Sequence, residues 1–308
     1  AQYLSWKHDI PMVHTYHTFW AEYAHYLPFV PKKFVNKMDN LLFSKNFCNR
    51  CQHIIAPSGQ MKDKLDEYGI TTPITIIPTG IELDKIQAID GSTFRDEYKI
   101  KNNAPMLIFV GRCGLEKNVF FLLESFKEIL KKKSNAVLFI AGDGPERINM
   151  EAYVKEFGMD KNVIFAGYIS HEDIFRAYSE ADVIMFPSKT ETQGLSLLEG
   201  LAMGKPAVCI NEMGVTSILE NNIGGFLTEE DIGKYSQKVL ELLDNKQLHK
   251  TKQQEALSRA NTFSSRSMVD KILQVYEQAI QDKKNSPTKK QSIDKFFSES
   301  ILNKFLKG

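Results

Sequence analysis

The sequence predicts an α/β protein with two Rossmann-like, doubly wound domains, of which the N-terminal one is incomplete. Short apolar runs of strand length alternate with amphipathic helical patterns, which is typical of a mostly parallel sheet covered by helices on both faces. The 308 residues exceed one ordinary domain. About six strand-like runs follow residue 105, enough for a complete doubly wound sheet, whereas the preceding segment supplies about half of one.

The composition limits the classes of partner that the protein can bind and the cell compartment in which it is expected. The chain is 43% hydrophobic and 25% charged, which is typical of a globular protein, and its net charge of +1 creates no field that would attract nucleic acid. No apolar run approaches the roughly 18 residues of a membrane span, and nothing at the start resembles a signal peptide. The four cysteines are too few for a disulfide framework. We therefore expect a cytoplasmic protein.

Residues 1–98 have the pattern of a partial N-terminal domain and a linker. The chain starts without a methionine and without a complete strand–helix unit before its first strand, so we expect part of this domain to be missing. The expected elements are a strand end at 12–17, a helical stretch at 32–51, a strand at 53–58, a helix closed by Gly69, a short strand within 74–83 and a linker of mixed polarity at 89–105.

Residues 99–261 contain a complete pattern of alternating strands and helices. Ser170 and Asp173 have the spacing of an N-terminal capping pair for one of these helices. A helix at 262–283 and a basic amphipathic tail at 284–308 complete the chain. The expected strands begin near residues 106, 136, 162, 181, 206 and 224, and the expected helices lie at 118–133, 146–158, 171–181, 195–204 and within 229–281.

The window FPSKTETQGLSLLEGLAMGKP contains two acidic residues that point to a ligand. Glu191 lies in a loop beyond the carboxyl end of a strand, where open α/β sheets bind ligands. Glu199 lies about one turn into the next helix among leucines, where a carboxylate is costly without a partner. The hydroxyls of a sugar or ribose would provide hydrogen-bond partners for this carboxylate. Gly194 precedes the amides of Leu195 and Ser196, a helix N-terminus suited to phosphate.

Two cations follow the first strand of this domain in the window Gly111-Arg-Cys-Gly-Leu-Glu-Lys-Asn. Arg112 follows the strand directly, and Lys117 is expected to open a helix. A lysine at a helix N-terminus opposes the macrodipole, so local stability does not explain it. Converging cations beyond strand ends would bind a diphosphate. The spacing does not match a P-loop.

Two further windows carry weaker signals. Gly142 belongs to the turn Ala-Gly-Asp-Gly-Pro at another strand end, where glycines permit close approach of the backbone. His14 and His17 have no acidic or cysteine ligand nearby, so we expect no metal site there. His17, at the strand end near the cleft, is the better functional candidate.

Together these windows resemble the retaining GT-B glycosyltransferases of family 4, over nearly the whole chain. The most specific match is the E-x7-E motif, Glu191 and Glu199, within a run that continues as GLSLLEGLAMGKPAV. The phrases IIPTGIEL and FSSRSMVDKILQVYEQAI resemble the family's interdomain crossing and its last helix, which returns to the N-terminal domain. The resemblance implies a GT-B fold whose C-terminal domain holds most of the nucleotide-sugar donor.

The family's site residues carry over onto matching positions. The resemblance implies that Glu191 contacts the donor sugar, that Glu199 contacts the ribose hydroxyls and that His17 lies beside the reacting sugar. Arg112 and Lys117 match the diphosphate-binding pair. Further donor contacts are implied at Gly111, Gly142, Gly194, Leu195 and Ser196, and at the strand end Gly167, Tyr168 and Ile169, where the base meets main-chain groups.

The resemblance also implies the reaction. The sugar leaves the nucleotide diphosphate with retained configuration, by front-face attack through an oxocarbenium-like state. Arg112 and Lys117 stabilise charge on the leaving diphosphate, so we expect no metal or other cofactor. The chain departs from the family in lacking its first strand and glycine-rich loop. We therefore expect a fragment and do not assume that it is active alone.

The acceptor is predicted from basic and aromatic residues at 14–50 and from the basic tail. Basic amphipathic helices suit an anionic membrane surface, although a core-facing helix with solvated lysines has the same pattern. The N-terminal phrase also looks like bacterial diacylglycerol glucosyltransferases, which make glycolipids from a UDP-sugar. We expect transfer of glucose from UDP-glucose to diacylglycerol by a protein bound peripherally to the inner face of the cell membrane.

Three alternatives remain open. A family 4 transferase could act on a polysaccharide or another soluble acceptor. A nucleotide-sugar 2-epimerase shares this architecture, although the E-x7-E loop argues against it. A non-catalytic fragment that binds a sugar nucleotide is favoured only by the incomplete N-terminal domain.

Overall fold

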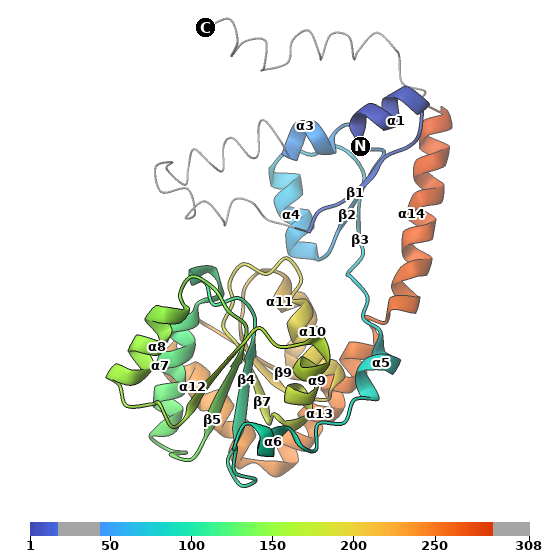
Figure 1. Ribbon diagram of the computed structural model, residues 1–308. Coiled ribbons are helices and arrows are strands. Elements are labelled where there is room, and N and C mark those ends of the chain that lie inside the picture. Colours follow the sequence, from blue (N-terminus) through green and yellow to red (C-terminus); the bar gives the residue numbers. More distant parts are fainter. Residues whose placement is uncertain (18–43, 286–308) are drawn as a thin grey trace, which may run out of the picture.

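A computed structural model describes residues 1–17 and 44–285. These residues contain two parallel sheets, one with the order β1-β2-β3 and one with the order β6-β5-β4-β7-β8-β9 (Figure 1). The strands are β1 (Val13–Thr15), β2 (His53–Ala56), β3 (Ile74–Ile76), β4 (Met106–Val110), β5 (Val137–Ala141), β6 (Val163–Gly167), β7 (Val183–Phe186), β8 (Ala207–Ile210) and β9 (Gly225–Thr228).

The helices lie between the strands, as the alternating pattern predicts. They are α1 (Gln2–His8), α3 (Lys45–Cys48), α4 (Gly59–Glu67), α5 (Leu83–Gln87), α6 (Phe94–Glu97), α7 (Val119–Leu130), α8 (Arg147–Glu156), α9 (His171–Glu180), α10 (Leu195–Ala202), α11 (Met213–Ile218), α12 (Ile232–Asp244), α13 (Lys246–Asn261) and α14 (Ser265–Asn285), with short 3-10 helices η3 (Leu115–Lys117) and η4 (Glu220–Asn222). Ser170 caps α9, because its Oγ accepts a hydrogen bond from the amide of Asp173 at 3.0 Å.

The six-stranded sheet has the doubly wound order of a Rossmann fold. Its strand order reverses between β4 and β7, which are hydrogen-bonded neighbours. Such a reversal leaves a crevice at the carboxyl ends of the two strands, because the connections leave toward opposite faces. The prediction of a complete doubly wound sheet in this part of the chain is confirmed.

Both faces of this sheet are covered by helices. Met106, Ile108 and Val110 belong to one cluster of buried side chains, with α9, α10 and α13, whereas Leu107 and Phe109 belong to another, with α7, α8 and α12. Successive side chains of a strand point to opposite faces, so a strand buried on both sides must be apolar throughout. The continuous apolar runs in the sequence have this cause.

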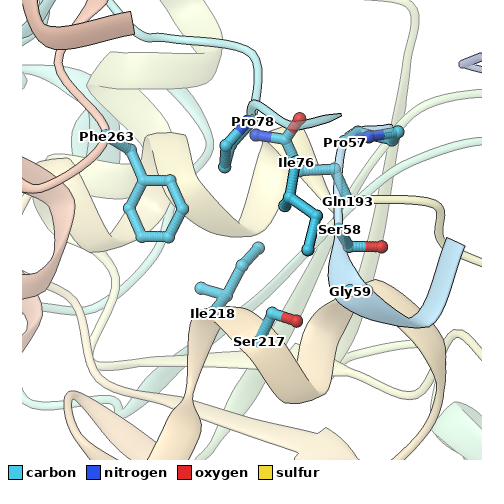
Figure 2. A pocket seen from close by; sticks show the side chains of 10 residues that line it. Pro57, Ser58, Gly59, Ile76, Pro78, Gln193, Ser217, Ile218 and Phe263 are labelled. Carbon is cyan, nitrogen blue, oxygen red and sulfur yellow. The ribbon is translucent and has the colours of Figure 1, made fainter. Parts of the chain in front are cut away.

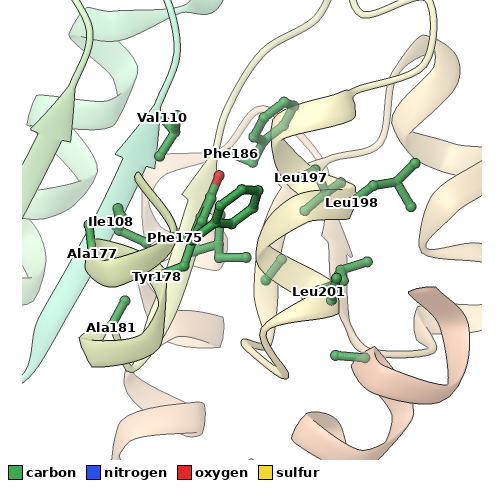
Figure 3. Close-up of a cluster of buried hydrophobic side chains, with 14 of the residues drawn as sticks. Ile108, Val110, Phe175, Ala177, Tyr178, Ala181, Phe186, Leu197, Leu198 and Leu201 are labelled. Carbon is green, nitrogen blue, oxygen red and sulfur yellow. The ribbon is translucent and has the colours of Figure 1, made fainter. Parts of the chain in front are cut away.

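Helix α10 packs closely on β7 and α9, as Figure 3 shows. A Cβ at Gly200 would lie 2.3 Å from Cδ1 of Ile184 and 2.8 Å from Cε1 of Tyr178. A larger residue would force these side chains to shift, so the glycine lets α10 lie close to the sheet.

The segment 89–105 differs from the expected linker, because it contributes to the core. Phe94 in α6 is fully buried, and its ring centroid lies 5.1 Å from that of Phe139 in β5. The ring of Tyr98 lies 4.8 Å from Phe139. Between these aromatics, Asp96 and Glu97 are exposed, whereas Arg95 is mostly buried and its Nε donates to Glu180 at 3.0 Å. These charged residues give the segment its mixed polarity.

The three-stranded sheet is held by the last helix. Met268 and Val275 of α14 pack against Ile55 and Ile77, and Figure 1 shows α14 running alongside this sheet. Helix α3 is the described part of the helical stretch expected at 32–51; residues 18–43 and 286–308, including nearly all of the predicted basic tail, lie outside the described residues. The domain boundaries at 98 and 261 stay predictions. Within the described parts of the chain, no helix is both long enough and apolar enough to cross a membrane.

Candidate functional site

The predicted site residues gather where the strand order of the large sheet reverses. After β4 the chain continues into η3, and after β7 it continues into residues 187–194, here called the β7–α10 loop. These two segments flank the crevice that the reversal creates. Side chains from both segments can therefore act on one ligand.

Lys117 and Glu191 meet across this crevice. Nζ of Lys117 donates a short hydrogen bond to Oε1 of Glu191, and the two side chains are only 18% and 17% exposed. Lys117 does not open α7, which corrects the sequence expectation. It ends η3, and Asn118, with a left-handed φ of 56°, separates it from α7. The turn at Asn118 places Lys117 outside the α-helix, so the conflict with the α7 macrodipole is reduced.

Arg112 is oriented by an acidic residue that the sequence analysis did not single out. Nε of Arg112 donates to Oε1 of Glu116 at 3.0 Å, and the Glu116 side chain is only 2% exposed. The carboxylate lies directly against Gly114, where a Cβ would be 2.4 Å from Oε2. The available signal in the sequence was an acidic residue between the two candidate cations, two residues after a glycine.

Further hydrogen bonds hold the β7–α10 loop in place. Oγ1 of Thr190 donates to the carbonyl of Glu116 at 3.3 Å. The amide of Gly214 donates to the carbonyl of Glu191 at 2.8 Å. These two bonds tie the loop to η3 and to α11, on the side of the six-stranded sheet.

Three predicted glycines lie in a row at the carboxyl ends of β4, β5 and β6. The amide of Gly142 donates to the carbonyl of Gly167 at 2.8 Å, and a Cβ at Gly142 would lie 1.9 Å from the carbonyl oxygen of Gly111. The close approach expected at Gly142 is therefore to the protein's own backbone. Beyond β6, Tyr168 is 82% exposed and Ile169 is partly buried.

Glu199 has a protein partner that sequence reasoning missed. Its Oε1 lies 3.0 Å from Nε2 of His171, the first residue of α9. Glu199 is 19% exposed and His171 is 68% exposed, so the pair faces the solvent side of α10. Burial raises the pKa of Tyr178 well above its ordinary value, and the charge of Glu199 raises it further. Tyr178 therefore stays protonated and donates to the carbonyl of Ser196 at 2.5 Å.

The helix N-terminus and the acceptor-side histidine also lie at this edge. Gly194 is the N-cap of α10 with a φ of 95°, so the chain turns and presents the amides of Leu195 and Ser196. The side chain of His17 is exposed, and its carbonyl accepts a hydrogen bond from Oγ1 of Thr192 at 2.8 Å. The structure thus brings the end of β1 to the β7–α10 loop.

The cysteines have no nucleophilic role in this arrangement. All four are free and buried. Burial, together with the nearby charge of Asp143, raises the pKa of Cys113 to about 11; a protonated thiol is a poor nucleophile. Within residues 1–17 and 44–285, no three acidic, histidine or cysteine side chains gather as metal ligands would.

The arrangement is suited to an anionic ligand with hydroxyl groups. The cations of Arg112 and Lys117 and the amides at the start of α10 favour negative charge. The carboxylates of Glu191 and Glu199 can accept hydrogen bonds from hydroxyls. These features define an α/β protein of the doubly wound type with a candidate site for an anionic ligand. The roles of the individual residues stay predictions.

The comparison with protein families identifies the class. Residues 90–261 match the profile of the glycosyl transferases group 1, and residues 1–85 match that of glycosyltransferase family 4. The chain belongs to the group 1 glycosyltransferases of family 4. The resemblance drawn from the E-x7-E motif is confirmed.

Similar proteins of known name include two bacterial enzymes. The alpha-monoglucosyldiacylglycerol synthase of Streptococcus pneumoniae is 30% identical over 71% of this chain and 50% of its own length. The alpha-monoglucosyldiacylglycerol synthase of Acholeplasma laidlawii is 29% identical over 74% of this chain and 60% of its own length. The chain thus spans about half to three fifths of these relatives.

Solved structures share the fold. Sucrose-phosphate synthase from Thermosynechococcus elongatus has a TM-score of 0.75 at 20% identity and covers 91% of this chain, which matches 71% of that protein. Anabaena HepE, solved in complex with UDP and glucose, has a TM-score of 0.77 at 19% identity, with 90% of this chain and 74% of HepE covered. At these identities the likeness shows the GT-B fold.

Proposed function

We propose that this chain is the donor-binding part of a retaining glycosyltransferase that moves glucose from UDP-glucose to diacylglycerol. The observation that carries the proposal is the Lys117–Glu191 pair at the reversal of the strand order. A cation for the diphosphate and a carboxylate for the sugar hydroxyls lie there side by side, which suits a sugar bound through a diphosphate.

Each donor group has a partner in this proposal. Lys117 and Arg112 bind the diphosphate with the α10 amides, and Glu191, released from Lys117 by the incoming phosphate, accepts hydrogen bonds from the sugar. Glu199 accepts from the ribose hydroxyls. The base meets main-chain groups at Gly167–Ile169, beyond β6.

Charge on the leaving diphosphate is balanced by the two cations without a metal or other cofactor. Positive groups that are already fixed where charge develops need no reorganisation during the reaction. Glu116 fixes Arg112 in this way, since its buried carboxylate holds Nε at 3.0 Å. His17 stands beside the reacting sugar on the acceptor side. As the resemblance to the family implies, transfer retains the configuration, and without a metal it is insensitive to chelators.

The lipid acceptor is supported by the names of the two similar synthases and by the basic sequence around residues 32–50 and 284–308. Lysines interspersed with aromatic and aliphatic residues bind anionic lipid surfaces. We propose peripheral attachment to the inner face of the membrane. Binding to vesicles with an anionic lipid, and its loss in salt or with neutral vesicles, tests this attachment.

The first experiment is calorimetric titration of UDP, and separately GDP, into the 308-residue chain. We expect saturable binding of UDP, with weaker binding of GDP. Lys117→Ala should weaken UDP binding by about 30-fold, because a charge-assisted contact is lost and Glu191 is left beside the phosphates. Lys131→Ala is the matched control, since Lys131 is exposed and pairs only with Glu128 within the described structure; it should leave binding unchanged.

Transfer itself is measured with the full-length protein. Labelled UDP-glucose and vesicles containing diacylglycerol should yield a labelled lipid, and Glu191→Ala should reduce the rate at least about 100-fold. A labelled soluble product would favour the soluble-acceptor alternative, and epimerised free sugar would favour the epimerase. Near-normal rates in Glu191→Ala would refute the site assignment.

A further inference from the structure

Two residues that follow the loop carboxylate, Thr192 and Gln193, connect the two parts of the chain. Gln193 forms a reciprocal pair with the backbone of Thr79, on the crossing between the two halves of the chain. The amide of Thr79 donates to Oε1 of Gln193 at 2.7 Å, and Nε2 of Gln193 donates to the carbonyl of Thr79 at 2.9 Å. Gln193 is only 4% exposed. A side-chain amide that satisfies both backbone groups of one residue fixes its own orientation as well as its distance.

Thr192 makes two more contacts to the N-terminal part. Its carbonyl accepts from Oγ of Ser58 at 2.7 Å, and its Oγ1 donates to the carbonyl of His17 at 2.8 Å. On the opposite side, a Cβ at Gly214 would lie 2.3 Å from the Thr192 carbonyl oxygen. The backbone next to Glu191 is therefore held from both parts of the molecule.

The hydrogen bonds of Gln193 are not supported by dense packing. A pocket of about 150 Å³ lies beside Gln193 between the two parts, lined by apolar side chains that include Ile76, Ile218 and Phe263 (Figure 2). Space beside a side chain forfeits dispersion contacts on that side. The reciprocal pair with Thr79 therefore contributes much of what fixes the Gln193 side chain relative to the N-terminal part.

From this geometry we infer that Gln193 is a positioning residue, which places Glu191 for the donor sugar only when the N-terminal part is docked. This inference rests on the proposed function of Glu191. Gln193 touches no reacting atom in it. Its hydrogen bonds join the N-terminal part to the loop that carries the carboxylate two residues earlier. The position of Glu191 against the donor sugar therefore depends on the docking of the N-terminal part.

The test compares two interdomain glutamines. Gln193→Ala removes the pair with Thr79. Gln60→Ala is the matched control, because Oε1 of Gln60 in α4 accepts from Oγ of Ser217 in α11 at 2.6 Å, a bond between the same two parts of the chain that involves no residue of the β7–α10 loop. Thr192→Val is a second, nearly isosteric variant that removes only the bond to His17. Amide hydrogen exchange of residues 189–195 is measured for all three in the 308-residue chain.

We expect exchange in the β7–α10 loop to rise about 30-fold in Gln193→Ala, which loses two hydrogen bonds, and about fivefold in Thr192→Val, which loses one, with β4–β6 unchanged. Each hydrogen bond contributes roughly a factor of five. In Gln60→Ala the loop should match the unaltered protein. The inference is overturned if the loop exchanges at the same rate in Gln193→Ala and in the unaltered chain. It is also overturned if Gln60→Ala raises the exchange of the loop as much as Gln193→Ala does. If Gln193→Ala does not fold, Thr192→Val decides by the same comparison.

Affinities then separate this inference from the proposed function. Gln193→Ala should keep the affinity for UDP and lose about tenfold for UDP-glucose, because only the sugar contact through Glu191 is displaced. A parallel fall in both affinities overturns the positioning role. Absence of UDP binding in the unaltered chain would count against the proposed function alone, since the exchange comparison does not depend on a ligand.

Discussion

The two sheets of this molecule share a parallel arrangement but are stabilised in different ways. The six-stranded sheet is covered on both faces by helices that lie next to its strands in the sequence, and two extensive clusters of buried side chains result. The three-stranded sheet depends on α14, the last described helix, for one of its smaller clusters. Most residues of the candidate site are therefore placed by one sheet and its connections, whereas strand β1 is placed by contacts from distant parts of the chain.

The largest effect is expected in the core of the six-stranded part. Phe94→Ala removes a fully buried ring that packs on Phe139, and we expect a loss of about 4 kcal/mol in the free energy of unfolding. Urea denaturation measures it. Phe157, 44% exposed, provides the control, and Phe157→Ala should cost less than about 1 kcal/mol. Equal costs would show that α6 is a linker rather than part of this core.

A backbone test addresses the glycine row. Gly142→Ala places a methyl group 1.9 Å from the Gly111 carbonyl oxygen, at a residue whose φ is 141°. We therefore expect a loss of about 3 kcal/mol in the free energy of unfolding. Gly158→Ala also has a positive φ, 67°, but has nothing within 4 Å of the added atom. It should cost about 1 kcal/mol from backbone strain alone. Thermal unfolding distinguishes the two, and similar values would mean that the strand ends can separate freely.

The attachment of α14 to the three-stranded sheet is tested by shortening one buried side chain. Met268→Ala removes a side chain that is 3% exposed against the three-stranded sheet. We expect a loss of about 2 kcal/mol in the free energy of unfolding, because the cluster is small. We also expect faster amide exchange in β2 and β3, with β4–β9 unchanged. Val269→Ala, at a position 49% exposed, should change neither. Exchange that rises equally in both sheets would contradict the separate stabilisation of the two parts.

The smallest effect is a dependence on pH confined to the three-stranded sheet. Burial lowers the pKa of His14 and of His53 below the ordinary value of 6.5; His17 lowers that of His14 further, and Asp282 partly offsets the shift at His53. The unfolded chain therefore binds more protons below pH 6.5, so stability falls as the pH falls through that window. Amide exchange in β1 and β2 at pH 7.5 and 5.5, corrected for intrinsic rates, measures it. His14→Gln together with His53→Gln should remove the dependence.

The sequence alone predicted the features that depend on residues close together in the chain. Continuous apolar runs predicted all six strands of the large sheet, and the Ser170–Asp173 spacing predicted a real cap. The carboxyl ends of those strands then predicted the edge at which Glu191 and the cations would gather. That deduction needs only the rule that parallel strands end on the same side.

The remaining features depend on contacts between distant positions. His171 reads as an exposed residue in the first turn of a helix, and its bond to Glu199 spans 28 residues without a local pattern. Phe94 is surrounded by polar residues, so its burial is visible only once β5 lies beneath it. Lys117 was placed one residue too close to α7, because the left-handed turn at Asn118 has no strong signal in the sequence.

The bonds of Thr192 to Ser58 and His17 also have a kinetic meaning, since they join residues 134 and 175 positions apart. Closing such long segments of chain is entropically costly and contributes little until both parts have formed. A refolding chain should therefore regain the six-stranded core first and a fixed β7–α10 loop last. Recovery of sugar-nucleotide affinity would then lag behind recovery of helical signal, and the interval between them would report how quickly the two parts dock.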